Sequence, residues 1–241
     1  MNVLTVMDGG RSTPPRPERM LPPWRHVLLV VAHPDDETFG LGAVAARLAA
    51  AGKMVHVLCF THGEASTLNA GHADLHAARA RELRQAADEL GVTSVRLLGY
   101  EDGHLAAAAP AELAGHVSRL AASTGAEGLL VFDDTGITGH PDHQAATRAA
   151  LDAAGAAGLP VLAWALLESI AAQLRAETGV AFAGQPADRM DFCIRVHRAR
   201  QRRAALAHAS QVSPAAVVWR RLQLQGDCEH LRWLRPPRPG S

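Results

Sequence analysis

The sequence predicts an α/β protein, a three-layer sandwich in which helices cover both faces of a mostly parallel sheet. Short runs rich in β-branched residues alternate with segments of helical periodicity along most of the 241 residues, and 48% of the residues are hydrophobic, enough for a sizeable core. No repeat or linker divides the chain. We therefore expect one domain over residues 26–235, a flexible leader over 1–25 and a loose tail over 236–241.

The elements follow in order. Residues 26–32 (HVLLVVA) and 54–60 (MVHVLCF) are typical of strands, and the segment between them repeats apolar residues at helical spacing before a glycine stop. The next expected elements are a helix at 75–91, a strand at 94–100, a helix at 111–124, a strand at 128–133, a helix at 141–155 and a strand at 160–167. Beyond residue 175 the pattern weakens and indicates only a strand at 190–197 and a basic helix at 198–210.

Composition excludes some classes of protein. Lys+Arg and Asp+Glu balance at 24 each, which argues against a nucleic-acid binder. No apolar run approaches the roughly 18 residues of a membrane span, and the N-terminus lacks the pattern of a secretory signal. Cys59, Cys193 and Cys228 are an odd number of widely spaced cysteines, so we expect reduced thiols and a cytoplasmic location.

A cluster of ionisable residues follows the first predicted strand directly. In open parallel sheets the ligand crevice lies at the carboxyl ends of the strands, where this cluster begins. His33 and Asp36 stand three apart around Pro34, so an imidazole and a carboxylate could converge on one cation while Asp35 points elsewhere. The alternative is that Asp35, Asp36 and Glu37 only cap the helix that follows.

A second polar cluster follows the strand that ends near Phe132. His140 and His143 again stand three apart at the start of a predicted helix. Because the carboxyl ends of parallel strands meet at one edge, His143 could join His33 and Asp36 in a His/Asp/His set. Three protein ligands with an open position are the pattern of a catalytic zinc site. The alternative is a pair of histidines that bond to the backbone at the helix end.

Four motifs stand out in the sequence: AHPDDE at 32–37, THGE at 61–64, RARELRQAADELGV at 79–92 and GHPDH at 139–143. Together they resemble the PIG-L/LmbE family of metal-dependent N-acetylglucosaminyl deacetylases. The resemblance is close over residues 26–165 and looser beyond, where 205–211 (ALAHASQ) is similar to a segment that closes the family's fold and contains His208. It implies a Rossmann-like sandwich.

The resemblance also implies roles for individual residues. The metal ligands would be His33, Asp36 and His143. Asp35 would be the general base that takes a proton from water activated by the metal, which is sound chemistry for a carboxylate not bound to the metal. His140 would face the developing oxyanion, and Asp142 would orient it.

The expected substrate-binding residues are Arg79, Glu64 and Asp102. Arg79 matches the family's sugar-positioning arginine, or it is a solvated helix residue in contact with Glu82. Glu64 and Asp102 would order the site or simply occupy turns. Thr138 stands where mycothiol-pathway members tend to carry a tyrosine, and this weakens the case for a mycothiol precursor as substrate.

We therefore expect a zinc-dependent hydrolase that removes an N-acetyl or other N-acyl group from a glucosamine-containing small molecule. Ferrous iron is the alternative metal, since it also occupies sites of two histidines and one carboxylate. An amidase of the same family that acts on a thiol-sugar conjugate is the alternative enzyme. A nucleotide-binding module is disfavoured, because HPDDETFG lacks closely spaced glycines and its carboxylates would repel a pyrophosphate. The basic run at 195–203 is either a solvated helix face or a site for an anion such as a phosphate. The sequence does not decide whether the chain assembles into a homo-oligomer.

Overall fold

Within residues 17–68 and 74–238, which the computed structural model describes, seven strands form one sheet in the order β3-β2-β1-β4-β5-β7-β6. The strands are β1 (His26–Val31), β2 (Met54–Thr61), β3 (Ser94–Tyr100), β4 (Gly128–Phe132), β5 (Val161–Ala165), β6 (Phe192–Arg195) and β7 (Cys228–Arg235). The five strands from β3 to β5 run parallel, and β7 lies antiparallel between β5 and β6. The predicted mostly parallel sheet is confirmed.

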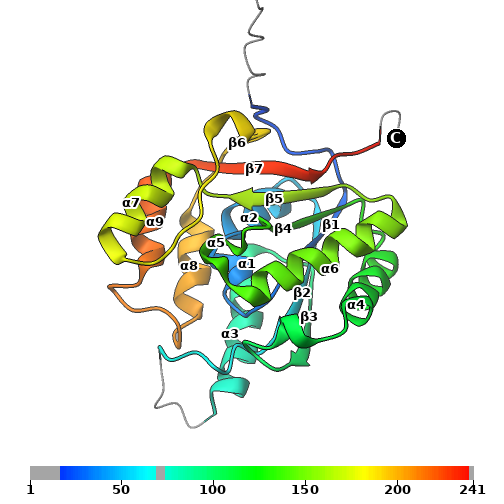
Figure 1. Ribbon diagram of the computed structural model, residues 1–241, viewed down its shortest axis with the longest axis horizontal. Coiled ribbons are helices and arrows are strands. Elements are labelled where there is room, and N and C mark those ends of the chain that lie inside the picture. The colour runs from blue at the N-terminus through cyan, green and yellow to red at the C-terminus, as the bar shows by residue number, and fades with distance from the viewer. Residues whose placement is uncertain (1–16, 69–73, 239–241) are drawn as a thin grey trace, which may run out of the picture.

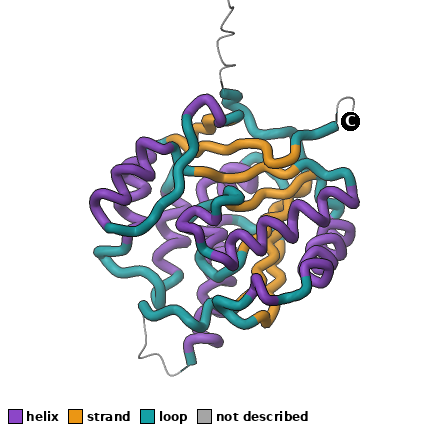
Figure 2. Tube along the Cα trace, viewed as in Figure 1, coloured by secondary structure: helices purple, strands orange, loops and turns teal. Residues whose placement is uncertain are grey.

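Helices cover both faces of this sheet (Figures 1 and 2). The helices are α1 (Asp36–Phe39), α2 (Gly42–Ala50), α3 (Leu75–Leu90), α4 (Pro110–Thr124), α5 (Gly136–Gly139), α6 (Pro141–Ala157), α7 (Glu168–Thr178), α8 (Ala199–Ala207) and α9 (Val217–Gln225), with 3-10 turns η1 (Leu105–Ala107) and η2 (Ala187–Arg189). One large core cluster joins the sheet to α2, α3 and α7, and a second joins it to η1, α4 and α6; a small third cluster lies between α2, α3 and α8. The three-layer sandwich is therefore confirmed.

Strand β1 shows how the sequence builds these two cores. Val27, Leu29 and Val31 pack into the core on one face, whereas Leu28 and Val30 pack into the core on the other. Successive side chains of a strand point to opposite faces, so a strand covered on both sides must be apolar throughout. Burial of each such side chain stabilises the fold by about 1.5–3 kcal/mol. The first polar side chains come only where the strand leaves both cores, at the edge that carries the site.

The C-terminal third contains elements that the sequence pattern did not predict, namely α7, α9 and β7. In β7 an inward position is held by Glu229, which is fully buried. Its carboxylate accepts hydrogen bonds from Trp164 Nε1 at 2.6 Å and Arg198 Nη1 at 2.5 Å. A charge at an inward position interrupts the apolar alternation that identifies a strand in a sequence. The charged partner that compensates it, Arg198, is distant in the chain, whereas Gln225 Nε2 donates to the same carboxylate from nearby at 3.0 Å.

Part of the expected leader packs against the sheet. Residues 1–16 lie outside the described residues, but Glu18 forms a β-bridge with Phe192. The ring of Trp24 lies edge-on to Trp233, with centroids 5.9 Å apart. Burial of these aromatic surfaces holds residues 17–25 in place, so this stretch differs from the expected flexible segment. In the expected tail, residues 236–238 have no regular structure and residues 239–241 lie outside the description.

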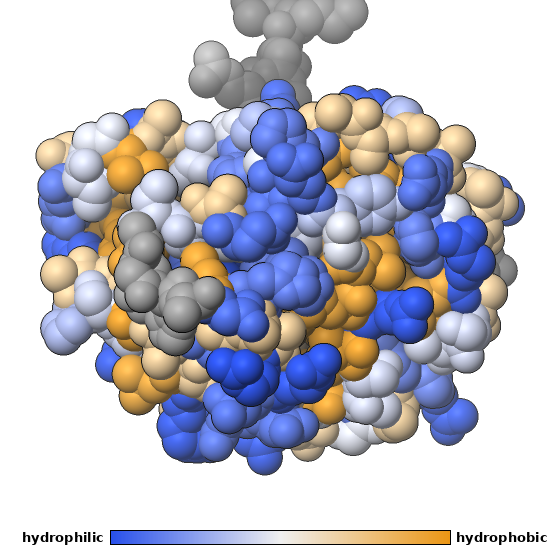
Figure 3. All heavy atoms as spheres, turned by 90° about the horizontal axis from the view of Figure 1, so that it is seen from below, coloured by the Kyte–Doolittle hydropathy of each residue, from blue (hydrophilic) through white to orange (hydrophobic). Residues whose placement is uncertain are grey.

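The surface is mixed in character. Figure 3 shows hydrophilic residues over most of the face seen from below, with a narrower hydrophobic strip between them. Exposed large hydrophobic side chains such as Met20, Leu68 and Leu206 are far apart in the sequence. Among the described residues, no helix combines the length and the apolar character required to cross a membrane.

Candidate metal centre

The turn after β1 places the first two residues of the site. The Asp36 carboxylate folds back on the strand end, where it accepts hydrogen bonds from the backbone N–H groups of Ala32 at 3.2 Å and His33 at 2.9 Å. Neither Asp35 nor Asp36 caps α1 with its side chain. The capping alternative is therefore wrong for these two carboxylates, which leaves Asp36 aimed at the edge of the sheet.

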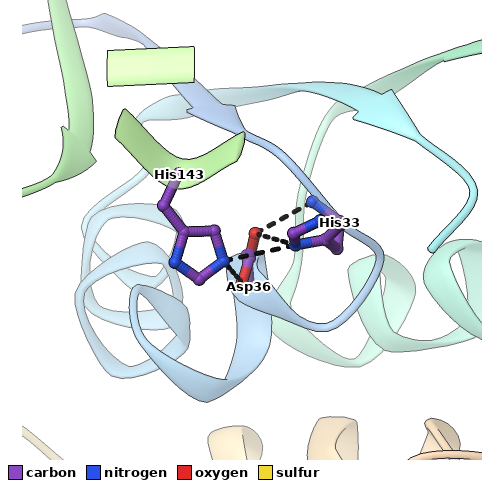
Figure 4. Close-up of side chains that lie close together, drawn as sticks. All are labelled: His33, Asp36 and His143. Atoms are coloured by element: carbon purple, nitrogen blue, oxygen red, sulfur yellow. Dashed lines mark hydrogen bonds and ion pairs between the residues drawn. The ribbon is translucent and has the colours of Figure 1, made fainter. Parts of the chain in front are cut away.

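His143, in the first turn of α6, completes a cluster with the two residues after β1. Its Nε2 lies 3.2 Å from His33 Nδ1 and 3.2 Å from Asp36 Oδ1, and His33 Nδ1 lies 3.5 Å from Asp36 Oδ2. Figure 4 shows the three side chains pointing toward one another. Donors bound at about 2.0–2.1 Å in a tetrahedral zinc site stand about 3.3–3.4 Å apart. The predicted trio therefore has the spacing that a metal ion requires.

The hydrogen bonds of the two imidazoles decide which nitrogens are free to bind a cation. His143 Nδ1 donates to the Gly136 carbonyl oxygen at 3.0 Å. His33 Nε2 faces the Asp102 carboxylate at 2.9 Å. Because carbonyl and carboxylate oxygens only accept, the outer nitrogen of each ring carries a proton, and a bound cation would replace any proton on the inner nitrogens that face each other. This is the tautomer arrangement that metal-binding histidines adopt.

The charge around the centre also suits a cation. Burial disfavours an imidazolium at His33, yet hydrogen bonds to Asp102, Asp142 and Asp36 raise its pKa to about 12. Burial likewise works against the charged form of Asp36, but the two histidines hold the pKa of its carboxyl well below its usual range. Several carboxylates thus surround one buried imidazole, and such a site favours a bound cation.

Asp35 occupies a strained position beside the cluster. Its φ of 115° lies in a region that side-chain-bearing residues rarely adopt. Arg79 Nη2 donates to Asp35 Oδ2 at 2.8 Å, and the same guanidinium binds the carbonyl oxygens of Pro34 and Gly63. Burial raises the pKa of Asp35 to about 6, while Arg79 opposes that shift. The result is a carboxylate held apart from the ligand trio.

Arg79 lies deeper than a sugar-contacting residue would need to. Its exposed fraction is 3%, and both terminal nitrogens bind the protein itself, whereas Nε is buried without a partner. Gly63 makes room for it, since a Cβ at that position would lie 2.0 Å from Arg79 Nη1. In this structure Arg79 positions Asp35, and a substrate contact through Arg79 stays a prediction.

Asp102 and Glu64, also expected to bind substrate, connect the loops around His33. Asp102 Oδ1 faces His33 Nε2, and Asp102 Oδ2 accepts from the Ala65 N–H at 3.0 Å. Glu64 Oε1 in turn accepts from the Asp102 N–H at 3.1 Å. The loops after β2 and β3 are thereby joined beside the metal-facing imidazole, so the structure assigns both carboxylates a supporting contact.

His140 and Asp142 stand at the start of α6. His140 Nδ1 accepts from the Asp142 N–H at 3.2 Å and so caps the helix. The expected orienting contact therefore comes from the backbone of Asp142. Its carboxylate accepts from the N–H groups of Gly103 at 2.8 Å and Leu105 at 3.1 Å, and it lies 3.4 Å from His33 Nε2. Burial and the neighbouring histidines lower the pKa of His140, which favours a neutral ring.

One buried pair beneath the site was missed by sequence reasoning. Glu37 Oε2 accepts from the Asp35 N–H at 2.9 Å, and Oε1 accepts from His208 Nε2 at 2.8 Å and Thr38 Oγ1 at 2.6 Å. Both Glu37 and His208 are fully buried. The signal that could have found Glu37 is its position directly beside Asp35 and Asp36, in the first turn of α1 (DETF); His208 had been noted by resemblance alone.

The basic run 195–203 is largely engaged in ion pairs. Arg198 Nη1 lies 2.5 Å from Glu229 Oε1, and Arg203 Nε lies 2.8 Å from Glu89 Oε2. These contacts tie α8 to β7 and α3. They leave less positive charge for an anion than the sequence suggests.

Together the fold and this donor set define an α/β protein with a candidate metal centre at the carboxyl ends of its parallel strands. The PIG-L family profile, described as GlcNAc-PI de-N-acetylase, matches residues 28–154, more than half of the chain. The chain therefore belongs to the PIG-L family.

Named relatives of the chain are deacetylases. The 1D-myo-inositol 2-acetamido-2-deoxy-alpha-D-glucopyranoside deacetylase of Salinispora arenicola is 35% identical over 156 residues, which cover 54% of this chain and 51% of that protein. A probable N-acetyl-alpha-D-glucosaminyl L-malate deacetylase 2 from Bacillus anthracis is 26% identical over 215 residues, covering 87% and 92%. The chain spans about half the length of the 1D-myo-inositol 2-acetamido-2-deoxy-alpha-D-glucopyranoside deacetylases that it matches.

Solved structures share the fold. The N,N'-diacetylchitobiose deacetylase from Pyrococcus horikoshii is 18% identical with a TM-score of 0.66, covering 88% of this chain and 85% of that one. The 4-carboxy-2-hydroxymuconate hydratase from Pseudomonas putida KT2440 is also 18% identical, with a TM-score of 0.68 and coverage of 90% and 99%. One fold thus carries two reactions, so the fold alone does not select the chemistry.

Proposed function

We propose that this protein is a zinc-dependent hydrolase that removes an N-acetyl or other N-acyl group from a glucosamine-containing small molecule. The observation that carries the proposal is the convergence of His33, Asp36 and His143 at tetrahedral spacing, with Asp35 in the same turn but outside the trio. Relatives whose names specify acetamido-sugar deacetylation support the substrate class. The three free cysteines without a CxxC pair favour a cytoplasmic location.

His33, Asp36 and His143 would hold the metal. Two imidazoles and one carboxylate suit zinc, and ferrous iron is the alternative that the same donors accept. When bound, the cation supplies Lewis-acid polarisation of the amide carbonyl and makes water a stronger acid. Asp102 keeps the proton of His33 on its outer nitrogen, so the inner nitrogen stays available as a ligand.

Asp35 would move the proton. Its carboxylate takes the proton of the attacking water and then delivers it to the leaving amine nitrogen, which departs as a free amine. A pKa of about 6, raised by burial, leaves Asp35 ionised at neutral pH yet able to hold a proton during the reaction. Arg79 fixes one carboxylate oxygen, which restricts the directions from which the other can act.

His140 would stabilise the negative charge that develops on the carbonyl oxygen. Its Nδ1 accepts from the backbone of Asp142, so a neutral ring carries its proton on Nε2 and can donate it to an oxyanion. The lowered pKa of His140 favours this neutral donor over an imidazolium.

The test separates metal binding from proton transfer. In His143→Ala we expect loss of the bound metal, measured by elemental analysis, together with loss of amine release from a panel of N-acetylglucosaminides. In Asp35→Asn the metal should stay while amine release falls by about 10²–10⁴-fold, since only the general base is removed. His104→Ala, a change at an exposed histidine, is the control. Unchanged activity in both site variants would overturn the proposal.

A further inference from the structure

Two cysteines distant in sequence meet on the edge of the sheet. Cys193 lies on β6 and Cys228 on the adjacent antiparallel strand β7, where Cys228 pairs with Arg195 in the strand register. Their Sγ atoms are 2.8 Å apart, although 35 positions separate them in the sequence. Both are free thiols and half-buried. A disulfide bond is about 2.05 Å long, so a small rotation of either side chain brings the sulfurs to bonding distance.

The surroundings of the pair give a reagent access to it. A cavity of about 290 Å³ is lined by Arg19, Cys193, Arg195 and Cys228. Arg195 Nε is paired with Asp227 Oδ2 at 3.2 Å, so Arg19 supplies the positive charge that favours an anionic reagent in this cavity. Burial and the neighbouring sulfur raise the pKa of the Cys228 thiol to about 11. Cys228 therefore stays protonated at neutral pH, and the first attack falls to Cys193, which lies on the edge strand β6.

The third cysteine differs in each of these respects. Cys59 is fully buried in β2, and its Sγ lies 3.6 Å from the Ala32 carbonyl oxygen and 3.4 Å from the Thr61 carbonyl oxygen. Burial raises the pKa of Cys59 well above its usual value. It serves as an internal reference for a thiol that solvent reagents do not reach.

We propose that Cys193 and Cys228 are a redox modification site that forms a reversible intramolecular disulfide with an anionic low-molecular-weight disulfide, such as glutathione disulfide, as oxidant. The Cys193 thiolate attacks the small disulfide, forms a mixed disulfide and releases one small thiolate. Cys228 gives its proton to that thiolate and attacks the Cys193 sulfur, which expels the second small thiolate; this thiolate takes up the proton that Cys193 lost when it ionised. Two electrons pass from the protein pair to the small disulfide, and two small thiols leave.

The bond would cross-link the edge strand β6 to its neighbour β7, both in the C-terminal third. β6 leads into α8, whose Gln201 donates to the Thr38 carbonyl oxygen at 3.0 Å, close to the candidate site. The Cys193 N–H donates to the Glu18 carbonyl oxygen at 2.9 Å, so the N-terminal bridge meets the same point. Closing a loop of this length restricts the unfolded chain, and we expect Tm to rise by roughly 5–10 °C on oxidation.

The test uses the full chain and needs no substrate. After incubation with glutathione disulfide, the wild type should lose two hydrogen atoms in mass and keep one thiol of three, titratable only after denaturation. Trypsin without reductant should give one species that joins peptides 190–195 and 222–232, and dithiothreitol should separate them and reverse the Tm shift.

Matched variants make the result specific. Cys193→Ser and Cys228→Ser should each fail to form the joined peptide and show no rise in Tm, whereas Cys59→Ala should still form it. If Cys59→Ala does not fold, labelling of native wild type provides the same distinction, because Cys59 should stay unlabelled. Three free thiols after oxidation, or only protein–glutathione adducts and disulfide-linked dimers, would overturn the proposal.

Discussion

The turn after β1 and the turn after β4 both bring metal-site residues to one edge of the sheet, but they are stabilised in different ways. Each contains a non-glycine residue with positive φ, Asp35 at 115° and Ile137 at 65°, and these are the two such residues in the described part of the chain. Asp35 directs a carboxylate into the site, whereas Ile137 packs into the core beside Gly136, itself at φ 73°. The backbone strain at Asp35 directs its carboxylate into the site. The backbone strain at Ile137 places its side chain in the core.

The supports of the two turns also differ in origin. Behind the first turn lies the fully buried Glu37–His208 pair, whose histidine comes from the end of α8. Behind the second lies Asp133, which accepts from Arg232 Nε at 2.6 Å and Gln185 Nε2 at 3.2 Å. Both turns therefore depend on a buried carboxylate that is paired with the C-terminal third. The partner of Glu37, His208, is fully buried, whereas the side chain of Arg232, which pairs with Asp133, is 17% exposed.

The largest expected effect follows from removing that support. His208→Ala leaves the Glu37 carboxylate buried without its main partner, and we expect a loss of about 3–5 kcal/mol in unfolding free energy, measured by denaturant titration. The exposed His104→Ala should change it by less than about 0.5 kcal/mol. Equal stability of the two variants would mean that the buried pair contributes nothing to the first turn.

The same pair predicts a pH dependence. Burial disfavours charge on His208, but Glu37 raises its pKa above the usual histidine value of 6.5. A raised folded-state pKa contributes stability that is fully present below about pH 6.5 and is lost as pH rises through the folded value. The difference in unfolding free energy between wild type and His208→Gln should therefore shrink as pH increases above 6.5. A difference that grows with pH would contradict this assignment.

A second, smaller effect concerns the metal. Asp102 keeps His33 in the tautomer that presents Nδ1 to the centre. Asp102→Asn should weaken metal affinity by about 10–100-fold, measured by competition with a chelating dye, because the carboxylate that holds the proton is lost. The exposed Glu101→Gln next to it is the control. Unchanged affinity in Asp102→Asn would show that His33 is oriented by Asp142 alone.

The smallest effect tests the strain itself. In a helix or strand, a protein with alanine at a given position is normally more stable than one with glycine there. At a position with positive φ this order is reversed, because glycine adopts that conformation without strain. Ile137→Gly should therefore be more stable than Ile137→Ala by about 1 kcal/mol, and the same sign should hold for Asp35→Gly against Asp35→Ala. Thermal unfolding of the four variants checks this. A higher Tm for either alanine variant would mean that its turn relaxes to an ordinary backbone conformation.

The N-terminal two thirds of the chain could be predicted from the sequence better than the C-terminal third. The apolar runs of β1 and β4 and the polar residues after them sufficed to predict the sheet, and with it the edge at which His33, Asp36 and His143 meet. Arg79, Asp102 and Glu64 were expected to bind substrate, and those contacts stay predictions. In the structure each of these side chains binds another part of the protein. Sequence spacing does not indicate which of several nearby partners a flexible polar side chain will choose.

By itself the sequence determined the alternation of strands and helices and the two places where ionisable residues leave the core, because both depend on local periodicity and on the cost of burying charge. The tertiary structure alone decided which carboxylates face His33, that Glu37 pairs with His208, and that Cys193 lies beside Cys228. These are contacts between residues far apart in the chain. They exist only once the sheet and the helices have closed around them and excluded water.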